Sequence, residues 1–225
     1  ITDMPSVIRR GTLSLLLASA LMVVLGYLSS PAAASFGVHA FYPSQEEDRT
    51  TAAGDVNGDG YIDLATGGDS GNVTIRLNDG EGSFGPATSL FAEAAIRSLA
   101  IGQFVGDGSF DLAVGSLYTF MVFEGDGSGV FGPVPEYQQS TRATSLAAGD
   151  LNGDGKPDFA AVHEQVEVLL GNGDGTFSTL AGFAAGDGPA SVVISNLDGD
   201  TKPDLAVANA RSHNVSILLG NGDGT

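Results

Sequence analysis

Clusters of acidic and amide side chains recur along the sequence at a spacing that could hold a metal ion. Each cluster follows the pattern D-x-N-x-D-G-x-x-D or a close variant of it. Side-chain oxygens at positions 1, 3 and 5, a backbone carbonyl at position 7 and a carboxylate at position 9 can surround one hard cation, and calcium accepts about six to eight oxygens. The predicted calcium ligands are Asp55, Asn57, Asp59, Tyr61 and Asp63 in the first loop, Asp150, Asn152, Asp154, Lys156 and Asp158 in the third, and Asn196, Asp198, Asp200, Lys202 and Asp204 in the fourth.

Other interpretations of these loops explain less. Three carboxylates within nine residues repel one another unless a cation lies among them, whereas a solvated acidic turn would need only the ordinary turn residues Asp, Asn and Gly. Magnesium prefers a tight octahedron, and the absence of Cys together with dispersed His residues excludes an ordinary zinc site. EF-hand and dockerin loops are excluded because position 12 is Thr66, Ala161 or Val207 and a strand is expected to follow.

The copies of the loop are not equivalent. The second has Gln103 and Val105 at two ligand positions and keeps only Asp107 and Asp111, so we predict that it binds no metal. The fourth has Thr201 where Gly is preferred, so we expect weaker binding there. At position 7, residues such as Tyr61 would contribute only their carbonyls, with their side chains pointing outward.

The loops belong to a longer repeat. Their first residues are separated by 48, 47 and 46 residues, and a second landmark, a Phe after a turn rich in small residues, keeps the same spacing. In the third repeat, the pattern predicts strands over residues 145–149, 159–162 and 165–170 and an outer strand that starts at Phe177. The Phe landmarks are Phe36, Phe84, Phe131 and Phe177.

Four short strands in a period of 40 to 50 residues are typical of a propeller blade. We therefore predict an all-β fold, a β-propeller of four-stranded antiparallel blades, with an innermost strand of small residues where the blades converge. The predicted repeat units are residues 49–96, 97–143, 144–189 and 190–225, and residues 35–48 are predicted to form an outer strand that completes a blade. We expect these four repeats to be part of a larger ring.

Composition restricts the partners and the cellular location. The formal net charge of −18 disfavours nucleic acid, whose phosphates would be repelled, and also anionic lipid. Arg9 and Arg10, an apolar run at residues 13–28 and small residues at 32–34 predict a cleaved signal peptide over residues 1–34. The alternative is a membrane anchor, but the run is shorter than the roughly 20 residues that span a bilayer. We therefore expect a secreted or cell-surface protein, extracellular or periplasmic, with no membrane contact after cleavage.

The repeats resemble the FG-GAP/VCBS family of calcium-loop propeller blades, found in integrin α-subunit heads and in exported bacterial proteins. The resemblance is carried by DVNGDGYIDL, DLNGDGKPDF, the LLGNGDGT turns and the pairs Phe36-Gly37, Phe84-Gly85 and Phe131-Gly132. It implies that the loops join the first two strands of each blade and hold calcium structurally, and that about seven blades form a ring.

Binding is a better interpretation of this chain than catalysis. The segment Gly68–Gly71, with sequence GDSG, is predicted to be a hairpin turn, and His39, His163 and His213 lie at different phases of the repeat, so we predict no enzyme activity. The predicted function is an exported calcium-binding module for adhesion, with an extracellular protein or glycan as its ligand. The alternative is the propeller domain of a polysaccharide lyase or another carbohydrate-active enzyme.

Overall fold

The computed structural model describes residues 40–43, 47–92, 95–139, 142–180 and 182–225. The chain divides into two compact units, Ile1–Phe41 and Tyr42–Thr225. The predicted signal peptide and most of the predicted outer strand at 35–48 lie outside the described residues, so both remain predictions. Within the latter segment, residues 40–43 are not in a strand, and Asp48 already belongs to β1 (Asp48–Gly54). The described residues contain no helix that is long and apolar enough to cross a membrane.

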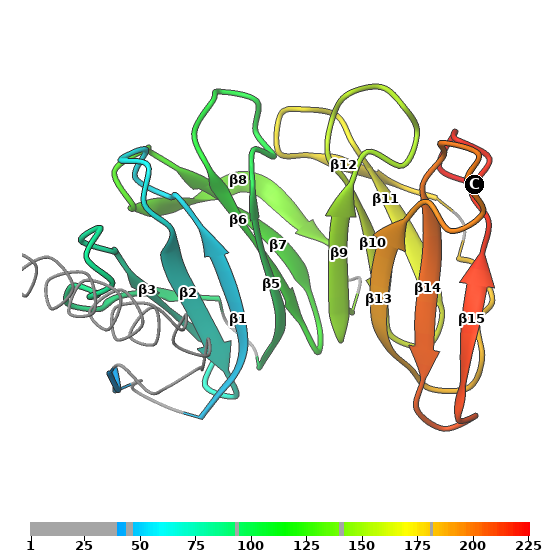
Figure 1. The fold of residues 1–225 in the computed structure, drawn as a ribbon, viewed down its shortest axis with the longest axis horizontal. Coiled ribbons are helices and arrows are strands. Elements are labelled where there is room, and N and C mark those ends of the chain that lie inside the picture. The colour runs from blue at the N-terminus through cyan, green and yellow to red at the C-terminus, as the bar shows by residue number, and fades with distance from the viewer. Residues whose placement is uncertain (1–39, 44–46, 93–94, 140–141, 181) are drawn as a thin grey trace, which may run out of the picture. The chain divides into compact units, whose positions relative to one another are not determined.

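The described part of the unit Tyr42–Thr225 folds into four antiparallel sheets that follow one another in sequence (Figure 1). The first sheet contains β1, β2 (Asp63–Gly68), β3 (Asn72–Arg76) and β4 (Thr88–Phe91). The second contains β5 (Ile96–Gly102), β6 (Asp111–Ser116), β7 (Phe120–Gly125) and β8 (Phe131–Gln139). The third contains β9 (Ser145–Gly149), β10 (Asp158–Val162), β11 (Val166–Gly171) and β12 (Phe177–Thr179). The fourth contains β13 (Pro189–Ser195), β14 (Asp204–Asn209) and β15 (Asn214–Leu218).

This architecture confirms the predicted all-β, propeller-like fold. Three of the sheets have four strands, each paired with its sequence neighbours, and the fourth has three strands in the described residues. In the third repeat, the predicted first strand coincides with β9, and the predicted outer strand begins at Phe177 as β12 does. Strand spacing and turn residues were therefore sufficient to place the elements of a regular repeat.

The outer strand of the first sheet does not begin at its Phe landmark. Phe84 forms an isolated bridge with Asn78, and β4 begins only at Thr88. Pro86 separates the two, and proline interrupts a ladder because it has no N–H to donate. Phe84 is held instead by Tyr42, whose hydroxyl accepts the Phe84 N–H at 3.0 Å and whose ring packs edge-on against it.

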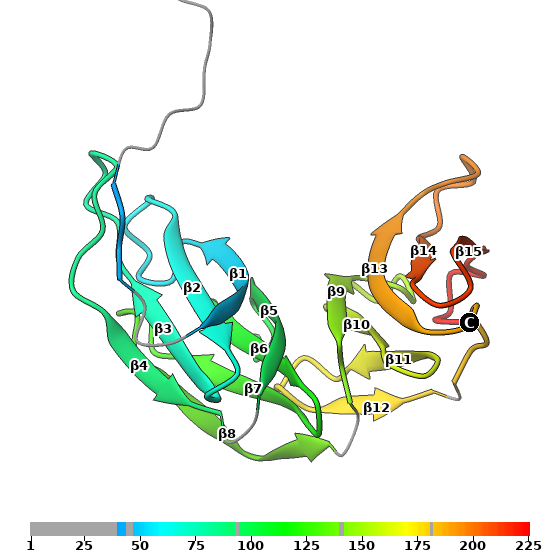
Figure 2. The ribbon, with the colours of Figure 1, turned by 90° about the horizontal axis from the view of Figure 1, so that it is seen from below.

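Successive sheets meet along their first strands, which lie on the inner side of the array (Figure 2). Small residues are required there because the backbones approach closely. A Cβ added to Gly54 in β1 would lie 2.5 Å from the Ile101 side chain in β5, and one added to Gly149 in β9 would lie 3.2 Å from Ile194 in β13. The predicted convergence of the blades at these strands is confirmed.

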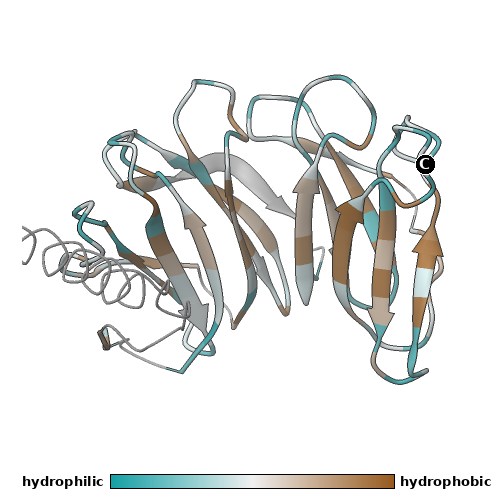
Figure 3. Cartoon of the chain, viewed as in Figure 1, coloured by the Kyte–Doolittle hydropathy of each residue, from teal (hydrophilic) through white to brown (hydrophobic). Residues whose placement is uncertain are grey.

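The core lies between the sheets, because each central strand buries both of its faces. In β6, Leu112 and Val114 pack in one cluster with Val73 of the first sheet, whereas Ala113 packs in another with Phe159 of the third. The strands are accordingly the most hydrophobic segments, and many of the connecting loops are hydrophilic (Figure 3). This division of the chain leaves the polar loops free to carry function.

Candidate calcium loops and a polar pocket

The four predicted loops connect the first two strands of each sheet and lie at one edge of the array (Figure 1). Positions 4 and 6 of each loop have positive φ, for example 73° at Gly58 and 89° at Gly60 in the first loop, which glycine adopts without steric cost. Thr201 occupies position 6 of the fourth loop with φ of 77°. A side chain in this conformation costs about 1–2 kcal/mol, so Thr201 is strained where the other loops have Gly.

In the first loop, the predicted ligands organise the backbone. The Asp55 carboxylate accepts the N–H groups of Asp59 at 3.1 Å and Gly60 at 2.8 Å. Asn57 Oδ1 also accepts the Asp59 N–H, and Asp59 accepts the Tyr61 N–H at 2.8 Å. The loop therefore closes around its side-chain oxygens.

The third loop repeats this arrangement. Asp150 accepts the N–H groups of Gly153 at 2.7 Å, Asp154 at 3.2 Å and Gly155 at 2.9 Å. Asp154 in turn accepts the Lys156 N–H at 2.9 Å. The structure thus brings the predicted residues of each loop into one compact turn.

The second loop achieves the same shape with a different first residue. Gln103 Nε2 donates to the carbonyl of Gly108 at 3.0 Å and so spans the loop. Asp107, at position 5, accepts the Ser109 N–H at 2.8 Å, as position 5 does in the other loops. A neutral amide therefore closes this loop, where the first and third loops use the Asp at position 1.

The Asp at position 9 has a role that sequence reasoning missed. In the third loop, Asp158 is fully buried, with one oxygen accepting the Leu151 N–H and the other the Gly171 N–H, both at 2.8 Å. These bonds join the start of the loop to the end of β11. Asp63, Asp111 and Asp204 are buried in the same way and make the equivalent pairs of bonds.

A sequence signal for this role was present. Positions 5 and 9 keep Asp in the second loop, although positions 1 and 3 have changed to Gln103 and Val105. A residue that was only a metal ligand would have no reason to remain in a loop without the other ligands. Asp111 remains useful because its carboxylate accepts three N–H groups, from Phe104, Val105 and Gly125.

The surroundings shift the pKa values of two position-9 carboxyls, those of Asp158 and Asp204, in opposite directions. Burial raises the pKa of Asp158, and the charges of Asp154 and Asp150 raise it further. The pKa of Asp204 is lowered, chiefly by the N–H of Gly220 and then by that of Leu197, which stabilise the carboxylate. A cation near the third loop would therefore relieve the electrostatic penalty that Asp154 and Asp150 impose on Asp158.

The donor chemistry of the loops suits calcium, because every predicted ligand offers oxygen. Across the described part of the chain, no group of three or more His, Cys, Asp or Glu side chains is arranged to hold a metal ion. In the first loop, for example, the oxygens of Asp55 and Asp63 accept backbone N–H groups. A bound cation would share these oxygens with the backbone or displace some of the hydrogen bonds.

The side chains at position 7 are exposed, as predicted, but they also contact a second turn of their own sheet. A Cβ added to Gly173, in the turn after β11, would lie 3.2 Å from the Lys156 side chain. A Cβ added to Gly222, in the turn after β15, would likewise lie 3.3 Å from the Lys202 side chain. The pKa values of Asp174 and Asp223 in these turns are lowered chiefly by hydrogen bonds from Thr176 and Thr225. The positive charges of Lys156 and Lys202 lower them by a smaller amount.

The residues considered for catalysis have structural explanations. Gly68–Gly71 is the hairpin turn between β2 and β3, as predicted, closed by a bond from the Gly71 N–H to the Gly68 carbonyl. Asp69 in that turn is paired with Arg49 and Arg97. His213 lies in the β14–β15 turn, and His39 lies outside the described residues.

His163 instead belongs to a polar pocket that sequence reasoning missed. The pocket has a volume of about 650 Å³ and lies at the β10–β11 turn, the end of the third sheet opposite the acidic loop. Arg142 Nη1 lies 3.3 Å from His163 Nε2, so this imidazole nitrogen accepts a hydrogen bond. The residues that line the pocket are Arg142, Ala161, His163, Glu164, Gln165, Glu167 and Thr179.

Antiparallel sheets in series, each with a loop of this kind between its first two strands, define a propeller-type repeat protein. The FG-GAP-like repeat family matches residues 55–114 and 104–161. Residues 55–161 are therefore similar to FG-GAP-like repeats. No curated protein matches it in sequence.

Two solved structures share the fold. An Agrocybe aegerita lectin that recognises non-reducing terminal N-acetylglucosamine is 24% identical, with a TM-score of 0.56 over 77% of this chain and 49% of the lectin chain. The V. cholerae biofilm matrix protein Bap1 is 23% identical, with a TM-score of 0.50 over 78% of this chain and 27% of Bap1. The chain thus spans about half of the first structure and about a quarter of the second.

Proposed function

We propose that the chain is an exported, calcium-stabilised repeat module that binds a glycan or protein ligand outside the cell. The observation that carries this proposal is the recurrence of one oxygen-lined loop conformation at the same edge of successive sheets. The first, third and fourth loops keep the ligand spacing, whereas the second lacks two ligands and is closed by Gln103. Export is tested by determining the N-terminus of the secreted chain, which should lie close to Ser35.

Calcium would act as a structural ion. The carboxylates of Asp150 and Asp154 lie in one loop with the buried Asp158, whose pKa their charges raise. A divalent cation supplies positive charge that compensates this repulsion. With that charge in place, the loop residues would hold the start of β10 and the turn after β11 in a fixed arrangement, since Asp158 already joins them.

Calorimetric titration of the full chain tests the metal assignment. We expect calcium to bind at the first, third and fourth loops, most weakly at the fourth, and to raise the melting temperature, with magnesium substituting poorly. Asp154→Asn should remove one site, whereas Asp187→Asn, at an exposed carboxylate that pairs with Arg211, should leave all sites intact. Absence of calcium binding at millimolar concentration would reject the assignment.

The polar pocket supports a glycan as the ligand. Planar polar side chains such as Arg142, His163 and Gln165 are suited to hydrogen-bond sugar hydroxyls, and the pocket is large enough for a small saccharide. Two proteins of similar fold are a lectin that recognises N-acetylglucosamine and a biofilm matrix protein. These likenesses motivate the choice of glycans as probes.

A glycan array with the full chain tests this second element. We expect saccharide binding that Arg142→Ala reduces at least tenfold. Arg211→Ala, at a side chain that is 77% exposed and does not line the pocket, should leave it unchanged. Incubation of bound polymers should yield no cleavage products. Cleavage would favour the carbohydrate-active enzyme instead, and equal binding by both variants would separate any glycan binding from this pocket.

A further inference from the structure

The polar pocket beside β10 and β11 occupies a place that the second repeat fills with apolar side chains. In every sheet, the third residue after the position-9 Asp lies opposite a residue of the third strand. Directly opposite residues of an antiparallel pair have their side chains on the same face of the sheet. The four pairs are Thr66 with Thr74, Val114 with Met121, Ala161 with Glu167 and Val207 with Ser216.

In the second sheet this pair is apolar and closely packed. Val114 is fully buried, Met121 is 5% exposed, and both belong to the core cluster that the second sheet shares with the first. In the third sheet, Ala161 is smaller than Val114, and Glu167 is charged where Met121 is apolar. A smaller side chain and a polar one therefore open the pocket on the face of the third sheet that is turned toward the second, where Ala161 shares a cluster with Val122.

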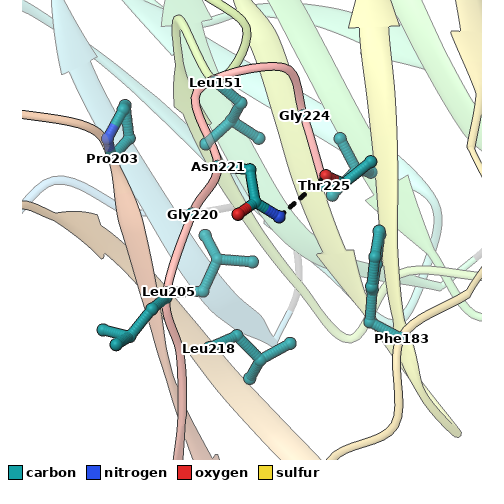
Figure 4. Close-up of a pocket in the computed structure, with 11 residues that line it drawn as sticks. Leu151, Phe183, Pro203, Leu205, Leu218, Gly220, Asn221, Gly224 and Thr225 are labelled. Carbon is teal, nitrogen blue, oxygen red and sulfur yellow. Dashed lines mark hydrogen bonds between the residues drawn. The ribbon is translucent and has the colours of Figure 1, made fainter.

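Polarity distinguishes this pocket from a second one, beside β15. Apolar side chains such as Leu205 and Leu218 line the second pocket (Figure 4), and none of the described residues around it is charged. The polar pocket contains Arg142, Glu164 and Glu167 instead. A saccharide, whose surface is rich in hydroxyl groups, therefore fits the polar pocket better.

The two carboxylates of the polar pocket are not neutralised within the described part of the chain. The ion pairs of the described residues include neither Glu164 nor Glu167. Arg142 donates instead to His163 Nε2 at 3.3 Å, so this imidazole is neutral while it accepts that bond. The pocket therefore has one positive and two negative side chains.

Calcium in the acidic loop would not change this balance. The loop and the pocket lie at opposite ends of β10, which has five residues. This corresponds to about 16 Å of strand, about twice the Debye length at physiological ionic strength. The excess of negative charge in the pocket is therefore a property of its own side chains.

This charge pattern favours one chemical class of sugar. Glu167 is half-buried, and a carboxylate that is partly removed from water is stabilised by a positive donor. An ammonium group supplies both the charge and a charge-assisted hydrogen bond. A carboxylate or sulfate group would be repelled by the pocket and by the net charge of −18 on the whole chain.

We propose that the polar pocket selects saccharides that carry a free amino group over neutral and acidic ones. Glu167 accepts hydrogen bonds from the ammonium group, Glu164 adds negative charge, and Arg142 donates to a hydroxyl group. This proposal rests on the proposed glycan-binding function and adds the chemical class of the sugar.

Isothermal titration of the full chain, with calcium and near pH 7, tests the proposal. The ligands are matched trisaccharides of glucosamine, glucose and glucuronic acid, which share one type of ring and carry an ammonium group, no charge or a carboxylate. We expect the glucosamine trisaccharide to bind at least tenfold more tightly than the glucose one. The glucuronic acid trisaccharide should bind most weakly.

Two charge variants separate the pocket from the general acidity of the chain. Glu167→Gln keeps the shape of the side chain but removes its charge, so it should lower the affinity for the glucosamine trisaccharide at least tenfold. Glu81→Gln removes the same charge from the exposed turn after β3 and should leave this affinity unchanged. Ala161→Val, which introduces the residue of the second repeat, should fill the pocket and weaken binding of every saccharide. Melting curves should show that these variants fold.

The possible outcomes are distinct. Equal affinity for the glucose and glucosamine trisaccharides, or equal effects of Glu167→Gln and Glu81→Gln, would overturn the amine preference. Equal competition by lysine amide would also overturn it, because the pocket would then recognise an ammonium group rather than a sugar. If the saccharides bind equally and binding depends on Arg142, the amine preference fails and the glycan-binding function stands. If no saccharide binds at millimolar concentration, both fail.

Discussion

Replacing Asp111 by Ala should destabilise the second repeat strongly, although we predict that its loop binds no metal. The Asp111 carboxylate is fully buried and accepts N–H groups from Phe104 at 2.6 Å, Val105 at 2.8 Å and Gly125 at 3.1 Å. A hydrogen bond to a charged group contributes about 1.5–3 kcal/mol, and a buried donor without a partner costs a further 1–3 kcal/mol. Counting the longest bond as weak, we expect Asp111→Ala to lower the free energy of unfolding by about 3–5 kcal/mol.

Urea unfolding of the full chain, followed by circular dichroism with calcium and with a chelator, measures this loss. Asp111→Asn, which retains one acceptor oxygen, should cost about half as much. Asp107→Ala serves as the control, because this exposed residue in the same loop accepts one bond, from the Ser109 N–H at 2.8 Å. The reasoning is refuted if Asp111→Ala costs less than about 1 kcal/mol, or if its cost disappears with the chelator.

Two further predictions concern strain and pH. Thr201→Gly should raise the free energy of unfolding by about 1 kcal/mol, because it releases the backbone strain at φ of 77°. The reciprocal substitution, Gly155→Thr, should lower the free energy of unfolding by a similar amount. Equal urea midpoints for the two variants would contradict the strain at Thr201. Asp204 and Asp223 have lowered pKa values, so the stability they contribute is complete above the ordinary aspartate pKa of about 3.9 and is lost as the pH falls through their folded values. Asp158 has a raised pKa and acts with the opposite sign, since its protonation favours the folded state. The urea midpoint measured between pH 7 and pH 2.5 should therefore decrease as the solution becomes acidic, and it should decrease less steeply for Asp204→Asn. Urea midpoints that do not change with pH would be inconsistent with these pKa shifts.

The fold was predictable because each repeat satisfies local rules that the sequence displays directly. Small residues place β9, alternating polar and apolar positions place β11, and a Phe after a Gly-rich turn places β12. The spacing of the acidic residues around Gly153 and Gly155 places the loop between β9 and β10. In the first sheet the Phe landmark does not mark the start of the outer strand, because Pro86 lies between Phe84 and Thr88, where β4 begins. A regular repeat is thus predictable, and its exceptions follow from single residues.

The candidate site was predictable only in part. Spacing alone brought the predicted ligands of each loop together, since they lie within nine residues. The second partner of Asp158, the N–H of Gly171, lies on a different strand and depends on the register of the sheet. The pocket of Arg142 and His163 likewise joins residues that are 21 positions apart and carry no common motif.

The buried position-9 Asp changes how acidic motifs of this kind should be interpreted. Because Asp111 and Gln103 secure the second loop through bonds to backbone groups that need no cation, the shape of this loop does not depend on ion binding. An acidic motif of this kind is therefore not by itself a count of bound ions, because its position-9 Asp has a structural role of its own. Selection can vary ion occupancy from one repeat to the next while the scaffold stays the same.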